Sequence, residues 1–368
     1  APETAKGMFD AILIGRAEET WPLLLDDLSH NRLKSRYQDD YQNQYIHPPG
    51  YSIPGKDRYI YTNIVSTSRG CPYKCDFCYN SSPLSVPYIN RSIQDVLQDI
   101  HAIGKRHILF IDDNFAGNPQ WTMAFLEQLI PLNVKWSAAV CANIVAQPTL
   151  LDKLAESGCQ SLFIGFESVS PASLQQVHKT QNNVSTYEKL VDALHRRGIM
   201  VNASLVFGLP DDDVQTFERT LDWLVEQKIE TATAHILTPY PGTKLHERYA
   251  AQNRIMDFDL SHYDTAHVVF QPEKLTAQQL YAGYTGFYKQ FYSFKNILRR
   301  LPASPRQRVP YLLFNLFYRN FGRFTEGLAC LIPLHLLGEF AAWSSYHTGK
   351  IKVGYNKPRP KGGATQRE

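Results

Sequence analysis

The sequence predicts an α/β fold, in the form of a partial (β/α)6, TIM-like barrel. Six short apolar runs rich in β-branched residues recur between residues 59 and 238, and an amphipathic stretch separates each run from the next. Strands that alternate with helices pair in parallel through right-handed crossovers, which gives an open sheet or a barrel. Six such units, in a chain of 368 residues, make only part of a barrel and leave room for appendages.

The predicted strands and helices can be placed along the chain in order. Strands are expected at 59–67, 107–112, 134–140, 161–166, 199–207 and 232–238, and helices at about 92–103, 119–130, 149–157, 185–197 and 214–227. Prolines near first turns (Pro119, Pro148) and glycines just past last turns (Gly104, Gly158, Gly198) support these boundaries. Polar motifs should therefore gather at the C-terminal ends of the strands.

The segments outside the barrel, which is expected at 59–270, differ from it in composition. Residues 1–35 contain one strand and one helix, a β–α unit too small to bury itself. Residues 36–58 are polar and rich in Pro, Gly and Tyr, and we expect them to be a linker. Residues 271–368 are aromatic and basic, and we expect them to form a helical extension.

Charge and cysteine content suggest where the protein works. From residue 291 onward there are 13 Lys and Arg against three acidic residues, a charge of about +10 that suits an anionic surface. The longest apolar stretch, 327–338, is shorter than the roughly 20 residues that a bilayer requires. Three of six cysteines lie within eight residues, which indicates metal in a reducing compartment. We expect a cytoplasmic protein with peripheral membrane contact through its basic C-terminus and no nucleic-acid partner.

The stretch STSRGCPYKCDFCYN, directly after the first strand, carries the chemistry. Cys71, Cys75 and Cys78 have the spacing CxxxCxxC, so three thiolates can ligate three irons of a 4Fe–4S cluster and leave the fourth open. An open iron can chelate the amino and carboxylate groups of a methionine moiety, and one electron then breaks the adjacent C–S bond. The alternatives are three buried thiols or a zinc site, which needs a fourth Cys or His nearby.

At these residues the chain resembles the radical S-adenosylmethionine (SAM) superfamily, over roughly residues 59–260. The likeness lies in CxxxCxFC, with Phe77 before the last cysteine, on a loop after the first strand of a (β/α) series. It implies a 4Fe–4S cluster on the three cysteines, SAM as the second cofactor, and Phe77 near the adenine.

Further residues of this chain match SAM-binding positions of the family. Asp112, Asp113 and Asn114 end the second strand, where the family has a Gly-Gly-Glu-like segment that binds the methionine amino group; an Asx turn is the alternative. Glu167 and Ser168 match the ribose-binding position, since a carboxylate accepts paired hydroxyls.

Three other features belong to the same series of strands. Gly208, in VFGLP, matches a segment whose backbone approaches the adenine. Cys141, Cys159 and Cys330 are isolated, and we interpret them as small buried side chains, with a cavity-facing Cys141 as the alternative. His235 lies in an apolar strand, and we interpret it as a satisfied core histidine.

The N-terminal segment resembles the last, Rossmann-like β–α unit of the cobalamin-binding domain of one radical SAM subgroup. The subgroup motif G-E-A-E-x-T-W appears as GRAEETW, with Arg16 at the first acidic position, and the usual Asp-x-His-x-x-Gly is absent. The chain is either truncated or a natural short form, and a start at Ala1 favours a fragment. Cobalamin is expected only if a full domain lies upstream. The subgroup includes hopanoid methylases and the anaerobic magnesium-protoporphyrin ester cyclase.

These features predict an enzyme that cleaves SAM reductively to a 5′-deoxyadenosyl radical, which abstracts hydrogen from an organic substrate. A lipid or a tetrapyrrole would suit the aromatic, basic C-terminus. With an upstream cobalamin domain the product should be a methylated carbon; without one, oxidation, cyclisation or rearrangement is as well supported. An external ferredoxin- or flavodoxin-type donor should supply the electron. The alternatives are a non-enzymatic iron–sulfur or zinc protein, and a membrane-surface scaffold.

Overall fold

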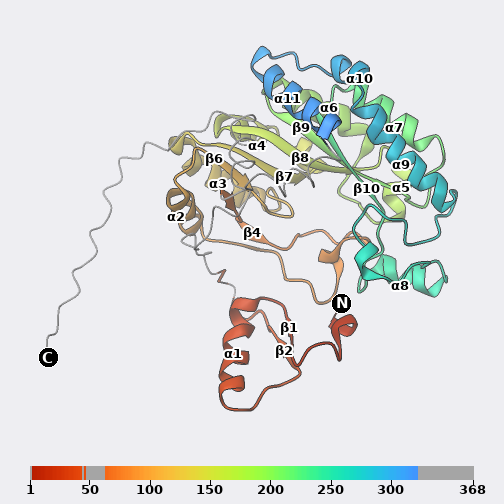
Figure 1. Ribbon diagram of the computed structural model, residues 1–368. Coiled ribbons are helices and arrows are strands. Elements are labelled where there is room, and N and C mark those ends of the chain that lie inside the picture. The colour runs from red at the N-terminus through yellow and green to blue at the C-terminus, as the bar shows by residue number, and fades with distance from the viewer. Residues whose placement is uncertain (1, 44, 47–62, 322–368) are drawn as a thin grey trace.

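Six parallel strands form the central sheet, in the order in which they occur along the chain (Figure 1). The computed structural model describes residues 2–43, 45–46 and 63–321. The strands are β3 (Ile64–Val65), β6 (His107–Phe110), β7 (Lys135–Cys141), β8 (Cys159–Glu167), β9 (Met200–Phe207) and β10 (Thr231–Ile236). Because β3 and β10 are the two edges of this sheet, the barrel is open, which confirms the predicted partial (β/α)6 fold.

The crossover helices begin and end close to their predicted positions. They are α2 (Ile93–Ile103), α3 (Pro119–Leu129), α4 (Pro148–Glu156), α6 (Tyr187–Arg196) and α7 (Thr216–Glu226). Local signals set their ends: Ser92 caps α2 by accepting the Asp95 N–H, and Gly104 ends it with φ +61°. A further short helix, α5 (Pro171–Gln176), follows β8 and has too few residues to show a helical period in the sequence.

The two faces of the sheet differ in polarity. On β8 the side chains Leu162, Ile164 and Phe166 are fully buried on the outer face, beneath the helices. The alternate residues Ser161 and Gly165 are half-buried on the inner face. The hydrophobic core thus lies between sheet and helices, whereas these inner-face positions of β8 are less completely buried.

The C-terminal region is helical as far as it is described. It contains α9 (Ala277–Phe291), α10 (Phe294–Arg299) and α11 (Pro305–Phe321), and α8 (Lys244–Ala251) precedes it at the end of the barrel segment. The Tyr288 hydroxyl accepts from the Ala234 N–H (2.8 Å) and donates to the Ala234 carbonyl (3.0 Å), so α9 satisfies the free edge of β10. Among the described residues no helix has the length and apolarity needed to cross a membrane; the apolar stretch 327–338 and Cys330 lie outside them.

The N-terminal residues form a small β–α–β lobe (red in Figure 1). Strand β1 (Ile12–Ile14) pairs in parallel with β2 (Arg36–Gln38), and α1 (Ala17–Ser29) connects them. The segment expected to be a linker therefore starts with a strand, in which Tyr37 is buried against the lobe. Arg16, where the family motif has an acid, forms a buried ion pair with Asp39 (2.6 Å).

Candidate active site

The three clustered cysteines lie on a loop that follows β3, at the C-terminal end of the sheet. All three are free, Cys75 is buried, and Cys71 and Cys78 are half-buried. Burial raises the pKa of the Cys71 thiol to about 12, and the neighbouring sulfurs add to this rise; burial also raises the pKa of Cys78. A bound metal centre would reverse this preference, because coordinated thiols lose their protons. Three free thiols whose charges would interact fit the donor set of a cluster with one open iron.

No three His, Cys, Asp or Glu side chains surround a single-ion position anywhere in the part of the chain that the structure describes. A cubane differs from a single ion because it spreads its thiolate ligands over separate irons.

Asp76, between Cys75 and Phe77, anchors the cysteine loop to the rest of the barrel. Its buried carboxylate hydrogen-bonds His178 Nδ1 (2.8 Å) and accepts from Arg248 Nη1 (3.3 Å). Its backbone N–H donates to the Val177 carbonyl (3.1 Å). The sequence does not single out Asp76, because its partners are more than 100 positions away.

Asp112 holds the start of the same loop. Its buried carboxylate accepts four hydrogen bonds, from the backbone N–H and the hydroxyl of both Thr67 and Ser68, at 2.5–3.0 Å. Burial raises the pKa of Asp112, and these four hydrogen bonds oppose the rise. Both of its oxygens are therefore engaged by the protein itself.

The other two residues of this segment occupy different environments. Asp113 is exposed and accepts a hydrogen bond from the Tyr79 hydroxyl. Asn114 is buried, and its side-chain oxygen accepts from the Cys141 N–H (3.4 Å) at the end of β7. The three residues thus share the strand end but not one binding position.

Glu167 is turned by an irregularity at the end of β8. The register between β8 and β9 shifts at Gly165 and Glu167, and Glu167 has φ +63°. A bulge of this kind re-aims a side chain and is common beside active sites. The carboxylate accepts from buried Lys179 and from the Ser204 hydroxyl (3.4 Å) on β9, so it lies on the inner face of the sheet.

Lys179 was not apparent from the sequence, although it is central to the site. Burial alone would lower the pKa of its amine, but the charge of Glu167 and the nearby sulfurs outweigh burial and raise it. The amine lies 6.0 Å from the centroid of the Phe77 ring. Its only sequence signal is the polar run HKTQNN shortly after the fourth strand.

Gln181, from the same polar run, connects this lysine segment to the cysteines. Its side-chain nitrogen lies 3.4 Å from Cys75 Sγ and 4.0 Å from Cys141 Sγ. Cys141 is buried, as interpreted from the sequence, but its thiol lies beside the cysteine loop. Ser168 instead serves local structure, because its hydroxyl accepts the Ser170 N–H (3.0 Å) ahead of α5.

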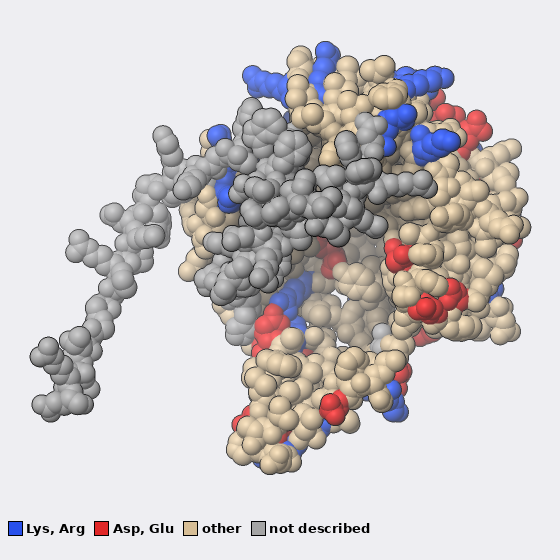
Figure 2. Space-filling model, viewed as in Figure 1, with Lys and Arg blue, Asp and Glu red and all other residues tan. Residues whose placement is uncertain are grey.

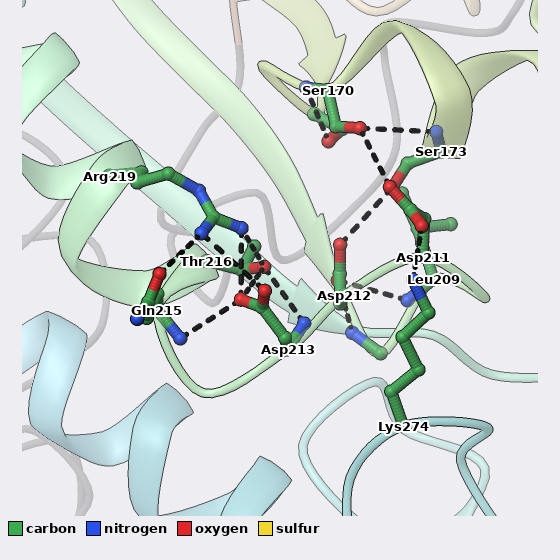
Figure 3. A network of polar contacts seen from close by, with 12 residues as sticks. Ser170, Ser173, Leu209, Asp211, Asp212, Asp213, Gln215, Thr216, Arg219 and Lys274 are labelled. Carbon is green, nitrogen blue, oxygen red and sulfur yellow. Dashed lines mark hydrogen bonds and ion pairs between the residues drawn. The ribbon is translucent and has the colours of Figure 1, made fainter.

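Gly208 begins a loop after β9 that three consecutive aspartates fix in place (Figure 3). Its φ is +92°, and its N–H donates to Asp212 (2.8 Å). Burial raises the pKa of Asp212 to about 7, although hydrogen bonds from Gly208 and Leu209 oppose this. Asp211 pairs with Lys274, and Asp213 pairs with Arg219 (2.9 Å), so the loop is tied to neighbouring segments on both sides.

Comparison with known proteins agrees with this arrangement. The model of the radical SAM superfamily matches residues 65–224, which include the cysteine loop, the second-strand motif, Glu167 and Gly208. Residues 65–224 of the chain carry a radical SAM domain. The chain is an enzyme of this type, and a 4Fe–4S cluster and SAM are its cofactors.

Relatives of this radical SAM chain include methyltransferases and a cyclase. It is 29% identical to the bacteriochlorophyllide d C-12(1)-methyltransferase of Chlorobaculum tepidum, over 84% of this chain and 71% of that protein. It is 25% identical to the hopanoid C-2 methylase of Rhodopseudomonas palustris, over 68% and 50%. It is 22% identical to the anaerobic magnesium-protoporphyrin IX monomethyl ester cyclase of Rubrivivax gelatinosus, over 72% and 49%, so the chain spans about half the length of the last two relatives.

Solved structures that are similar to the chain include the cobalamin-dependent SAM radical enzyme OxsB, with a TM-score of 0.49 and 15% identity over 75% of this chain and 50% of that one. They also include the radical SAM methyltransferase TsrM from Kitasatospora setae, with a TM-score of 0.47 and 19% identity over 52% and 37%. The chain thus spans about a third to a half of the length of these two proteins.

Proposed function

We propose that this radical SAM enzyme methylates a carbon of a tetrapyrrole. The observation that carries the proposal is its similarity to two bacteriochlorophyllide d methyltransferases of Chlorobaculum tepidum, each over 84% of the chain. That coverage extends well beyond the 160-residue family match at 65–224 and takes in the flanking segments.

We propose that Cys71, Cys75 and Cys78 ligate the cluster, which supplies the electron that cleaves SAM. The protein's part is to hold this loop still. Asp76 and Asp112 support this role, because one ties the middle of the loop and the other its start to neighbouring strands and helices. Fixed ligands leave the cofactor's geometry unchanged while the chemistry proceeds.

The SAM-binding assignment follows the inner face of the sheet. Glu167 is proposed to accept the ribose hydroxyls, with Lys179 holding its carboxylate in place and Ser168 shaping the turn behind it. Phe77 and Gly208 are proposed to border the adenine. At the methionine end, exposed Asp113 is proposed to face the amino group, whereas Asn114 holds the end of β7 through Cys141 and Asp112 acts through the loop that it supports.

The cobalamin expectation is conditional on a complete domain upstream. An ion pair between the N-terminal lobe and the start of the cysteine loop supports a role for the lobe. In this pair Arg69 Nη1, next to the loop, donates to Glu18 Oε2 of the lobe (3.0 Å). Figure 2 shows a hollow between this lobe and the barrel on the face drawn. We further propose an external ferredoxin- or flavodoxin-type donor, and peripheral membrane contact in the cytoplasm through the basic C-terminus from residue 291 onward, of which 322–368 lie outside the described residues.

Anaerobic reconstitution tests the proposal. We expect roughly four irons per chain. We also expect 5′-deoxyadenosine on reduction with SAM, and transfer of the SAM methyl label to bacteriochlorophyllide d when reduced, unmethylated cobalamin is added to accept that methyl group. Cys75→Ala should abolish both, whereas Cys159→Ala, a buried free cysteine away from the loop, should keep them. Unchanged SAM cleavage by Cys75→Ala would refute the cluster assignment.

A second candidate, oxidative ring cyclisation, is supported by the similarity to the magnesium-protoporphyrin ester cyclase. The two reactions differ in their products: cyclisation changes the mass of the tetrapyrrole without incorporating label from SAM. A hopanoid lipid should be tested in parallel, and label in the lipid alone would refute the tetrapyrrole substrate.

A further inference from the structure

On the inner face of the sheet, beside the larger Phe163, several small polar side chains are only half-buried. The Ser137 and Ser161 hydroxyls lie 2.9 Å apart across β7 and β8, and the Thr233 hydroxyl donates to Asn202 (3.3 Å) across β10 and β9. All four are half-buried. Complete barrels of this kind are instead filled by bulky branched residues, so this interior is suited to a bound molecule.

His235 stands on this inner face, near the C-terminal end of β10. Its neighbours Ala234 and Ile236 are buried on the outer face, whereas His235 is half-buried and lies opposite Val206 of β9. Strand alternation and register place His235 on the same face as Ser204 of β9, whose hydroxyl donates to Glu167 (3.4 Å). His235 is hydrogen-bonded, as interpreted from the sequence, and it lies half-buried on the inner face of the sheet rather than beneath the helices.

Thr265 fixes one side of the imidazole ring. His235 Nδ1 lies 3.0 Å from the Thr265 hydroxyl, and Nε2 has no hydrogen bond within the described residues. When Nδ1–H donates to Thr265, Nε2 carries the lone pair and is free to bind a metal; a hydrogen bond to the other nitrogen is how metal-binding histidines are oriented. Burial lowers the pKa of His235, which keeps the ring neutral and the lone pair available.

The backbone of Thr265, which makes this contact, is strained. Its φ is +67°, a conformation that is rare for a β-branched residue and costs of order 1–3 kcal/mol. Ile236 is next to His235 in the chain, and its N–H donates a hydrogen bond to the Thr265 carbonyl (2.7 Å). This hydrogen bond helps to hold Thr265 in its strained conformation. Strained residues of this kind cluster at ligand sites, because the surrounding structure must hold them.

We propose that His235 Nε2 is the axial ligand of the central magnesium ion of a tetrapyrrole substrate. The proposal rests on the tetrapyrrole class in the proposed function and adds how the substrate is held. Four ring nitrogens occupy the plane around the metal and leave an axial position, which a neutral imidazole can fill without adding charge. A macrocycle anchored at His235 lies along the polar inner face and directs one edge toward Glu167.

Optical titration of the full-length, cluster-reconstituted chain tests this. The probes are chlorophyllide a, which contains magnesium, and pheophorbide a, the same ring without metal. The wild-type chain should bind chlorophyllide about tenfold or more tightly than pheophorbide, with a shift of the absorption bands that marks axial ligation. His235→Ala should remove both the preference and the shift, and added imidazole should restore the shift.

Matched variants separate ligation from folding. His267→Ala changes an exposed histidine just beyond Thr265 and should behave as wild type. Thr265→Ser keeps the hydroxyl and should keep the preference, whereas Thr265→Ala should weaken it. If His235→Ala unfolds, axial ligation is still tested by two measurements. These are the preference of the wild-type chain for chlorophyllide, with its band shift, and the comparison of the two Thr265 variants.

The outcomes distinguish this inference from the proposed function. Equal binding of both probes, whether or not His235→Ala weakens it, overturns axial ligation but leaves the tetrapyrrole substrate standing. Binding of neither probe overturns the substrate class and this inference with it.

Discussion

Lys179 donates a hydrogen bond to the carboxylate of Glu167, and both side chains are almost completely buried at the C-terminal end of the sheet. The pair joins the end of β8 to the segment that contacts the cysteine loop through Gln181. The proposed ribose site and the proposed cluster site are therefore linked by a series of side-chain contacts, from Glu167 through the segment of Lys179 and Gln181 to Cys75.

Removal of the lysine should leave a buried carboxylate without its partner. We expect Lys179→Met to lower the free energy of unfolding by about 3–5 kcal/mol, as measured by urea denaturation. The double variant Lys179→Met/Glu167→Gln should recover part of this loss, because no charge is then stranded. Lys153→Met, which removes a partly exposed pair with Glu156, is the control and should have little effect. Equal losses in the two lysine variants would contradict the burial argument.

Asp112 should contribute more than Asp113 to holding the cysteine loop in place. Asp112→Ala removes four hydrogen bonds to Thr67 and Ser68, and we expect at least about 2 kcal/mol of destabilisation together with low iron content after reconstitution. Asp113→Ala, at an exposed position, should retain iron and stability. Normal iron content in the Asp112 variant would show that the loop forms without this support.

The ion pair between Glu18 and Arg69 should couple the N-terminal lobe to the barrel. Each side chain is about a third exposed, so we expect a coupling of only about 1 kcal/mol in a double-mutant cycle of Glu18→Gln and Arg69→Met. Limited proteolysis should cleave between lobe and barrel faster in either single variant. A coupling of zero would mean that the lobe is held by other contacts.

Asp212 should make stability depend on pH in an unusual direction. Its pKa is raised from 3.8 to about 7 in the folded chain, so between these values the folded state holds a proton that the unfolded state has lost. The contribution is full below pH 3.8 and is lost as the pH rises to about 7, with a slope of up to about 1.4 kcal/mol per pH unit.

Asp212→Asn provides the comparison, because an amide can accept from Gly208 and Leu209 and donate to Ser173 at any pH. The difference in unfolding free energy between wild type and variant should change between pH 5 and about 7 and level off above. A difference that stays constant over this range would contradict the raised pKa.

Gly208 should not tolerate a side chain. At φ +92°, a Cβ would lie 2.8 Å from Leu280, so we expect Gly208→Ala to destabilise the fold by about 1–3 kcal/mol. Gly286→Ala, within α9 and with open space around it, should instead leave stability unchanged or raise it by up to about 1 kcal/mol. Thermal unfolding of both variants checks the contrast.

The kinds of secondary structure and the cluster motif could be predicted from the sequence, because both depend on local spacing. Apolar periodicity placed all six strands and five crossover helices, and their alternation implied a parallel, partly closed sheet. The spacing of Cys71, Cys75 and Cys78 on one short loop likewise needs no knowledge of distant contacts.

Only the tertiary structure decided what the other polar residues do. Lys179 reaches Glu167 because a β-bulge and a loop bring them together, and no periodic pattern records either. Asp112 supports a loop 44 residues earlier rather than offering its oxygens outward. His235 lies on the inner face of the sheet, and Thr265 contacts it from 30 residues away. Such contacts arise from how separate elements pack, which local sequence spacing does not encode.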